Sequence, residues 1–127
     1  MRRLWVLGLL LVLGACAQAD QSGQRFVVYF QQWSAGLDDS AKQVVVSAAG
    51  WAREHPNVPV TVSGFADPDG SPQANRDLSR TRAQVVADEL TAQGVAAQRV
   101  RVDARGSVGF ALDSQESRRV TIVLGGG

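Results

Sequence analysis

Opposite charges gather in one short stretch of the sequence, residues 64–83 (GFADPDGSPQANRDLSRTRA). Asp67 and Asp69 follow a strand-like segment, and the helix-like segment after them carries Arg76, Arg80 and Arg82. A turn that only reversed the chain would not need so much charge. The pattern is therefore consistent with two interpretations: a solvated surface, or a site that binds a charged ligand.

Residue types needed for catalysis or metal binding are scarce. His55 is the only histidine and precedes Pro56 at an expected helix end, where a capping or solvated role is commoner than catalysis. Residues 67–70 resemble the start of a calcium loop, but the third oxygen ligand and the closing glutamate are absent at the required spacing. GxSxG, P-loop and GxGxxG motifs are also absent from the sequence. We therefore predict no enzymatic activity, no metal and no cofactor.

The first 16 residues have the pattern of a secretory signal. Two arginines precede an apolar run at residues 4–13, which is too short for a membrane-spanning helix of about 20 residues. Residues 13–16 (LGAC) resemble the lipobox of bacterial lipoproteins, in which the cysteine is acylated and the signal is cut just before it. The alternative is a plain signal with a cysteine there by chance. Because Cys16 is the only cysteine, an internal disulfide is impossible. Attachment of a lipid explains the presence of Cys16 better than a role as a nucleophile or a metal ligand.

Removal of a signal at residues 1–15 would leave a nearly neutral mature chain. Of the 13 basic residues Arg2 and Arg3 would be lost, leaving 11 beside 12 acidic ones, which gives no support for nucleic-acid binding. Residues 16–24 are expected to form a lipidated N-terminus and a polar tether of about 30 Å at most. Several acyl chains suffice for stable membrane attachment. In many lipoproteins an aspartate directly after the cysteine retains the protein in the inner membrane. This chain has Ala17 at that position, which by resemblance indicates the outer membrane.

The remaining sequence, residues 25–124, alternates strand and helix patterns and predicts one domain. Segments rich in β-branched and aromatic residues predict strands at 25–30, 58–65, 99–104 and 118–124. One helix is expected from Asp38 to the residue before Pro56, and a second from Ser71 to Gly94. Two helices on one side of a mixed sheet, in the order β-α-β-α-β-β, make an α+β two-layer sandwich. The helix residues expected to face the core are Val44, Val45, Ala48, Ala49, Ala52, Leu78, Val85, Val86 and Leu90.

The charged stretch is also similar to the signature of a known family. Residues 75–83 (NRDLSRTRA) resemble the N-x-x-L-S-x-x-R-A signature of OmpA-like domains of the peptidoglycan-associated lipoprotein type. Residues 64–67 (GFAD) stand where the family usually has Gly-His-Thr-Asp, and residues 117–120 (SRRV) where it usually has Asn-Arg-Arg-Val. The resemblance covers residues 25–124 and implies the OmpA-like fold.

By this resemblance the domain binds the diaminopimelate side chain of the peptidoglycan stem peptide. The free end of that side chain carries an ammonium and a carboxylate on one carbon, so its pocket needs a fixed anion and a fixed cation. Asp67 would accept the ammonium, and Arg82 would offer its planar fork to the carboxylate. Asn75 and Leu78 would supply polar contacts and a wall, and Arg118 would lie near the rim. Because the expected core stripe omits Asp67 and Arg82, we expect the fold to tolerate their replacement.

Several positions depart from the family pattern. Gln31 replaces a usual aspartate, Phe65 a histidine and Ala66 a threonine. Ala104 replaces a usual glycine, and Ser117 replaces a usual asparagine. The loop before the last strand, residues 107–116, is also shorter than typical. These changes leave open an alternative in which Asp67 and Arg82 form a salt bridge and bind no ligand.

Together these features predict a lipid-anchored outer-membrane protein whose periplasmic domain binds peptidoglycan and holds the membrane to the wall. In the alternative, the lipoprotein has kept the fold, lost the ligand and binds an envelope protein through its exposed faces. The two hypotheses differ in whether Asp67 and Arg82 point into an open pocket or close on each other.

Overall fold

The computed structural model describes residues 23–107 and 117–125. The expected signal peptide at residues 1–15, the lipid attachment residue Cys16, most of the tether and most of the loop at 107–116 lie outside the described residues. The elements in chain order are β1 (Gln24–Tyr29), α1 (Asp39–Glu54), β2 (Val60–Ala66), α2 (Pro72–Ala92), the 3-10 turn η1 (Ala97–Arg99), β3 (Val100–Ser107) and β4 (Arg119–Leu124). This order confirms the predicted β-α-β-α-β-β arrangement, although β2 begins two residues later than expected and β3 is longer.

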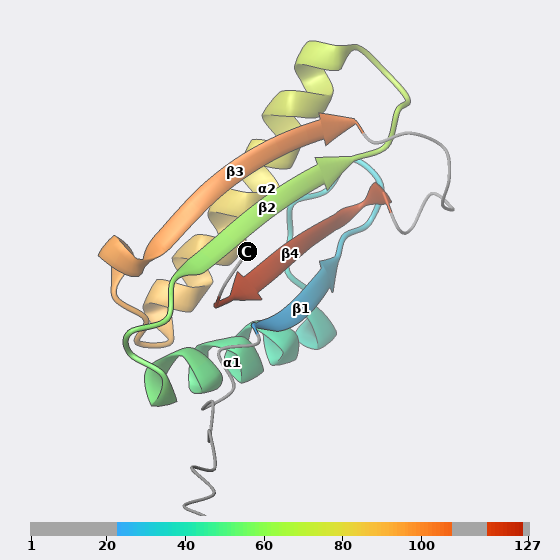
Figure 1. Cartoon of the computed structure of the whole chain (residues 1–127). Coiled ribbons are helices and arrows are strands. Elements are labelled where there is room, and N and C mark those ends of the chain that lie inside the picture. Colours follow the sequence, from blue (N-terminus) through green and yellow to red (C-terminus); the bar gives the residue numbers. More distant parts are fainter. Residues whose placement is uncertain (1–22, 108–116, 126–127) are drawn as a thin grey trace, which may run out of the picture.

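The four strands form one mixed sheet in the order β1-β4-β2-β3. Strand β4 is antiparallel to both of its neighbours, β1 and β2, whereas β2 and β3 are parallel. Figure 1 shows α2 running behind the sheet along β2 and β3, with α1 beside β1. The structure is therefore the predicted α+β sandwich of two helices on a mixed sheet. Neither described helix is long and apolar enough to cross a membrane.

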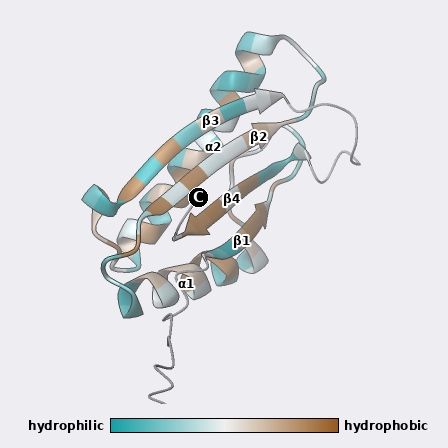
Figure 2. Cartoon of the chain, viewed as in Figure 1, coloured by the Kyte–Doolittle hydropathy of each residue, from teal (hydrophilic) through white to brown (hydrophobic). Residues whose placement is uncertain are grey.

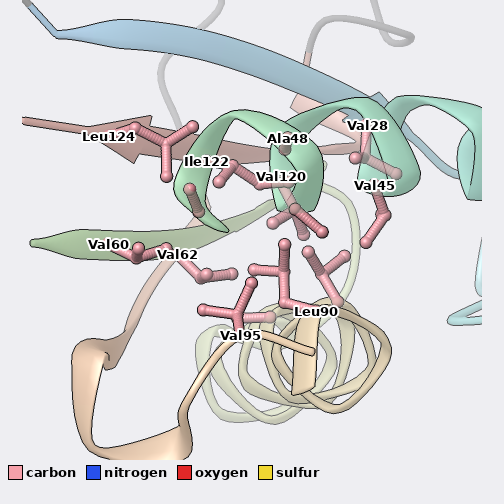
Figure 3. Packing of buried hydrophobic residues seen from close by; sticks show 14 of the residues in the cluster. Val28, Val45, Ala48, Val60, Val62, Leu90, Val95, Val120, Ile122 and Leu124 are labelled. Atoms are coloured by element: carbon pink, nitrogen blue, oxygen red, sulfur yellow. The ribbon is translucent and has the colours of Figure 1, made fainter. Parts of the chain in front are cut away.

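The hydrophobic core lies between the sheet and the two helices. Side chains from alternate positions of the strands point toward those of α1 and α2, as Figure 3 shows. Val45, Ala48, Ala49 and Ala52 of α1 are fully buried, as their helical spacing predicted, and Val44 is partly buried against them. The other fully buried apolar residues include Val28, Val60, Val62, Val86, Leu90, Val120, Ile122 and Leu124.

The buried face of α2 is only partly the predicted one. Val86 and Leu90 are fully buried, whereas Leu78 and Val85 are only half-buried. The first half of the helix instead buries Ser79, Arg82 and Ala83. The cause is that α2 approaches β2 closely at this end. A Cβ atom added to Gly64 of β2 would lie only 1.9 Å from the carbonyl oxygen of Ser79. Small and polar side chains therefore face the sheet at this end of α2.

Side-chain caps fix where both helices begin. The Asp38 carboxylate accepts from the Ala41 backbone N–H at 2.7 Å, and the Ser71 hydroxyl accepts from the Ala74 backbone N–H at 3.1 Å. Pro72 occupies the first turn of α2, where its missing N–H costs nothing. Both predicted starts are thus confirmed. They place the first turn of α2 directly after the loop that carries Asp67.

One end of the sheet is polar. Strand β4 changes in Figure 2 from hydrophilic at its start to hydrophobic toward its end. The start of β4 pairs with the last residues of β1, since Arg119 lies opposite Tyr29, while Gln24 pairs with Leu124 at the other end. The loops after β1 and β2 and the residues before β4 consequently meet at the polar end, far from the start of β1.

Candidate ligand-binding site

Four of the five residues predicted for ligand binding line one narrow hollow at the polar end of the sheet. Its lining residues are Gln32, Trp33, Asp67, Asn75, Leu78 and Arg82, and they pack so closely that the space between them does not admit a water-sized sphere. Three segments build it: the loop after β1, the residue that follows β2, and the first half of α2. The hollow therefore depends on the tertiary packing of these segments as well as on the charged stretch itself.

Arg82 is fully buried and holds two loops through their backbones. Its Nε donates to the Ser34 carbonyl at 2.8 Å, and its Nη2 and Nη1 donate to those of Gln31 and Phe65 at 3.0 and 3.3 Å. Its guanidinium also lies 5.3 Å from the centre of the Phe30 ring. The guanidinium has more N–H groups than these three bonds use, so it keeps donors for a further acceptor.

The electrostatic environment of Arg82 is that of a desolvated cation beside an anion. Burial lowers the pKa of Arg82 below its ordinary value, and the negative charge of Asp67 opposes this by raising it. The positive charge of Arg118 lowers the pKa further. Charges shielded from water interact more strongly than exposed ones, so an anionic group that entered this hollow would be attracted strongly.

The expectation that Arg82 lies outside the buried face of α2 is wrong. Its side chain is as buried as those of Val86 and Leu90. Helical periodicity of apolar residues could not reveal this, because the burial of Arg82 is stabilised by backbone carbonyls from segments far away in the sequence. Replacement of Arg82 must therefore affect the fold as well as any ligand.

Asp67 is held by the two residues that directly precede β4. The Ser117 hydroxyl donates to its Oδ1, and Arg118 Nη1 lies 3.4 Å from its Oδ2. Arg118 also donates from Nε to the Phe30 carbonyl at 3.1 Å and is only 18% exposed. Arg118 thus lies beside the hollow rather than lining it, and it fixes the carboxylate in place. The role of Ser117 was missed, although it directly precedes Arg118 in the matched motif.

Asn75 and Leu78 complete the wall on the α2 side. Asn75 is almost fully buried, and its side-chain amide donates to the Asp69 carbonyl at 2.9 Å. This bond ties the loop after β2 to the first turn of α2. Leu78 is half-buried and presents apolar surface to the hollow. Asn75 therefore positions the loop that carries Asp67, which no sequence pattern had indicated.

Trp33 is a lining residue that the sequence analysis did not single out. It is 57% exposed and has a left-handed backbone, with φ of 58°. Its ring lies against the loop after β2, since a Cβ on Gly70 would be 3.0 Å from Trp33 Cη2. A tryptophan in a loop after a strand carries no periodic signal, so only the tertiary structure reveals this contact.

Two solved structures share the fold of this chain. The crystal structure of the peptidoglycan-associated lipoprotein from Burkholderia pseudomallei matches with a TM-score of 0.73 at 24% identity, covering 78% of this chain and 89% of that one. The cell wall anchor of the T6SS from Pseudomonas aeruginosa matches with a TM-score of 0.66 at 24% identity, covering 83% and 82%. These likenesses establish the OmpA-like fold.

The chain belongs to the OmpA family, whose family model matches residues 29–120. It is 33% identical to the peptidoglycan-associated lipoprotein of Agrobacterium fabrum, with 79% of this chain and 60% of that protein covered. It is 30% identical to the peptidoglycan-associated lipoprotein of Brucella melitensis, with 91% and 76% covered. The chain thus spans less than two thirds of the Agrobacterium protein. The resemblance inferred from residues 75–83 is confirmed for the folded domain.

Proposed function

We propose that this chain is a non-catalytic lipoprotein of the outer membrane whose periplasmic domain binds peptidoglycan through diaminopimelate. The observation that carries the proposal is the pairing of opposite charges in one narrow hollow. The Asp67 carboxylate and the Arg82 guanidinium both line it. Each is held in position by groups that do not belong to a ligand. A preformed pair of this kind binds a zwitterion without the cost of ordering long side chains.

The chemistry of the two side chains matches the two charges of the diaminopimelate end group. Asp67 is acceptor-only when ionised and would take the ammonium, while the remaining N–H donors of Arg82 would take the carboxylate. Asn75 and Leu78 would bound the carbon chain between them. Arg118 would act through Asp67, because its Nη1 lies 3.4 Å from the Asp67 Oδ2.

The position of the chain's entry into the domain supports a tethering role. Strand β1 begins at Gln24, at the end of the sheet opposite the hollow. A lipid on Cys16 would hold that end near the membrane, so the hollow would face away from the membrane and toward the wall. The names of the Agrobacterium and Brucella relatives, both peptidoglycan-associated lipoproteins, support the same role.

Binding of the full chain to purified peptidoglycan sacculi tests the proposal. Wild type and Asp67→Ala are compared by co-sedimentation, with Asp103→Ala as the matched control, because Asp103 pairs with Arg105 on β3 at 2.7 Å. Loss of a charged hydrogen bond is worth roughly 1.5–3 kcal/mol, so Asp67→Ala should weaken binding by at least about tenfold. Asp103→Ala should bind like wild type.

Equal binding of all three proteins, or no binding by wild type, would contradict the proposal. Either result would favour the alternative in which the fold serves an interaction with another envelope protein. The membrane attachment is tested separately by Cys16→Ser. This variant should leave the outer-membrane fraction after cell fractionation, and its retention there would show that acylation is not the attachment.

A further inference from the structure

Trp33 is a large apolar residue that the core does not require. Its side chain is more than half exposed, and it does not belong to the hydrophobic cluster between sheet and helices. Its left-handed backbone, with φ of 58°, is unfavourable for a bulky residue. Exposed apolar surface and an unfavourable backbone both cost stability. Such an outlier is a reason to look for a functional contact.

The turn that carries Trp33 is fastened to Arg82. The Ser34 N–H donates to the Gln31 carbonyl at 3.1 Å and closes the turn around Trp33. Arg82 donates to both of these residues, at 3.0 Å to the Gln31 carbonyl and at 2.8 Å to that of Ser34. The position of the indole is thereby coupled to the guanidinium that the proposed function assigns to the ligand carboxylate.

The indole reaches from the loop after β1 to the loop after β2. A Cβ atom added to Gly70 would lie 3.0 Å from the Cη2 atom of Trp33, so the ring packs against the glycine backbone. Gly70 itself has φ of 90°, which only glycine adopts readily. The ring forms part of the wall of the hollow that contains Asp67. The ring of Trp33 therefore lies both against Gly70 and along the hollow.

An indole and a carboxylate that line the same hollow provide two kinds of attraction for an ammonium group. The aromatic face attracts a cation directly, tryptophan more strongly than the other aromatic residues. The ring also keeps water from the contact between the ammonium and Asp67, which strengthens that contact. We infer that Trp33 is a ligand-contacting residue that sets the affinity of the hollow for the ammonium of the bound zwitterion. This inference rests on the proposed function of the same hollow.

The test measures binding of a soluble diaminopimelate-containing tetrapeptide fragment of peptidoglycan to the full chain by calorimetry. Trp33→Ala should weaken binding by at least about fivefold, and Trp33→Phe, which keeps an aromatic face, should bind within about threefold of wild type. Trp51→Phe is the matched control, because Trp51 lies in α1 and does not line the hollow. Its ring stacks on that of His55, the C-cap residue of α1, with 3.8 Å between the ring centroids. The Trp51→Phe variant should bind like wild type.

Tryptophan emission gives a second readout that a purely structural role would not produce. Addition of the fragment should change the emission of Trp51→Phe, which retains Trp33, and should leave that of Trp33→Phe unchanged. If Trp33→Ala does not fold, this pair of emission measurements decides: a change confined to the chain that retains Trp33 supports the inference, and its absence overturns it.

Failure of this inference can be told apart from failure of the proposed function. If wild type binds the fragment, Asp67→Ala weakens binding and Trp33→Ala binds as tightly as wild type, only the role of Trp33 is overturned. If wild type does not bind the fragment, the proposed function and the role of Trp33 both fall.

Discussion

Two arginines at opposite ends of the sheet hold the backbone in the same way. At the polar end, Arg82 donates to the carbonyls of Gln31, Ser34 and Phe65. At the other end, Arg99 donates at 2.7–2.8 Å to the carbonyls of Ala52, His55 and Val58. Each cation thus ties together backbone carbonyls from segments that lie apart in the sequence.

The two arginines differ in their surroundings. Arg82 is fully buried, which lowers its pKa, lies near enough to Asp67 for that carboxylate to oppose the lowering, and lines a hollow. Arg99 is half-buried in η1 and holds the end of α1 against the start of β2. A buried arginine bonded to carbonyls is therefore not by itself a binding site. The adjacent fixed carboxylate and the shared hollow distinguish the polar end.

The largest effect is expected for Arg82→Ala. Removal of the fully buried guanidinium takes a donor from three carbonyls, of which that of Gln31 keeps the Ser34 N–H, and it leaves a cavity, so the free energy of unfolding should fall by about 3 kcal/mol or more. This is a large share of the roughly 5–15 kcal/mol of a typical domain. Urea denaturation followed by circular dichroism measures the change. A midpoint equal to that of wild type would show that Arg82 does not hold the two loops.

Arg99→Ala should destabilise the protein less and leave peptidoglycan binding intact. Arg99 itself is only half-buried, so water can reach part of the space that its side chain would leave, and we expect a loss of about 1–2 kcal/mol. Sacculus binding, measured well below the melting temperature, should match that of wild type. A tenfold loss of binding would remove the distinction between the two arginines.

Arg82→Lys separates the structural role of Arg82 from its proposed binding role. A lysine keeps the charge and can donate to some of the carbonyls, but it lacks the planar fork. We expect about 1 kcal/mol of lost stability and at least about a tenfold loss of binding to the diaminopimelate fragment. Titration calorimetry of the folded variant provides the measurement. Full binding by the lysine variant would mean that only the charge of Arg82 matters.

The smallest effect is expected for Arg118→Ala. Its contact with Asp67 at 3.4 Å is long, and Ser117 still donates to the same carboxylate in this variant. Stability should fall by about 1 kcal/mol or less, and binding should change by no more than about threefold. The same denaturation and calorimetry experiments measure both quantities. A loss of binding as large as that of Asp67→Ala would place Arg118 in direct contact with the ligand.

The sequence predicted the elements of the fold well because their signals are local. Asp38 and Ser71 mark the helix starts by their capping side chains, and the spacing of Val45, Ala48 and Ala52 marks the buried face of α1. The match of residues 75–83 to a family signature added the expected site. These features need only a few neighbouring residues to be recognised.

The parts that could not be predicted depend on contacts between distant segments. The bonds of Arg82 to Gln31 and Ser34 join residues about fifty positions apart, and those of Arg99 to the end of α1 are similarly long-range. The contact of Trp33 with Gly70 likewise joins two loops. Periodicity, capping and spacing carry no information about such pairs, because they arise only when the sheet is assembled.

The central claim is that the hollow between Asp67 and Arg82 recognises both charges of one zwitterion. The most direct measurement compares the affinity of the full chain for two soluble stem-peptide fragments, one with diaminopimelate and one with lysine at the same place. Lysine offers the ammonium but not the carboxylate, so Arg82 would lose its ligand partner. We predict at least about tenfold tighter binding of the diaminopimelate fragment. Equal affinity for both fragments, or binding of neither, would contradict it.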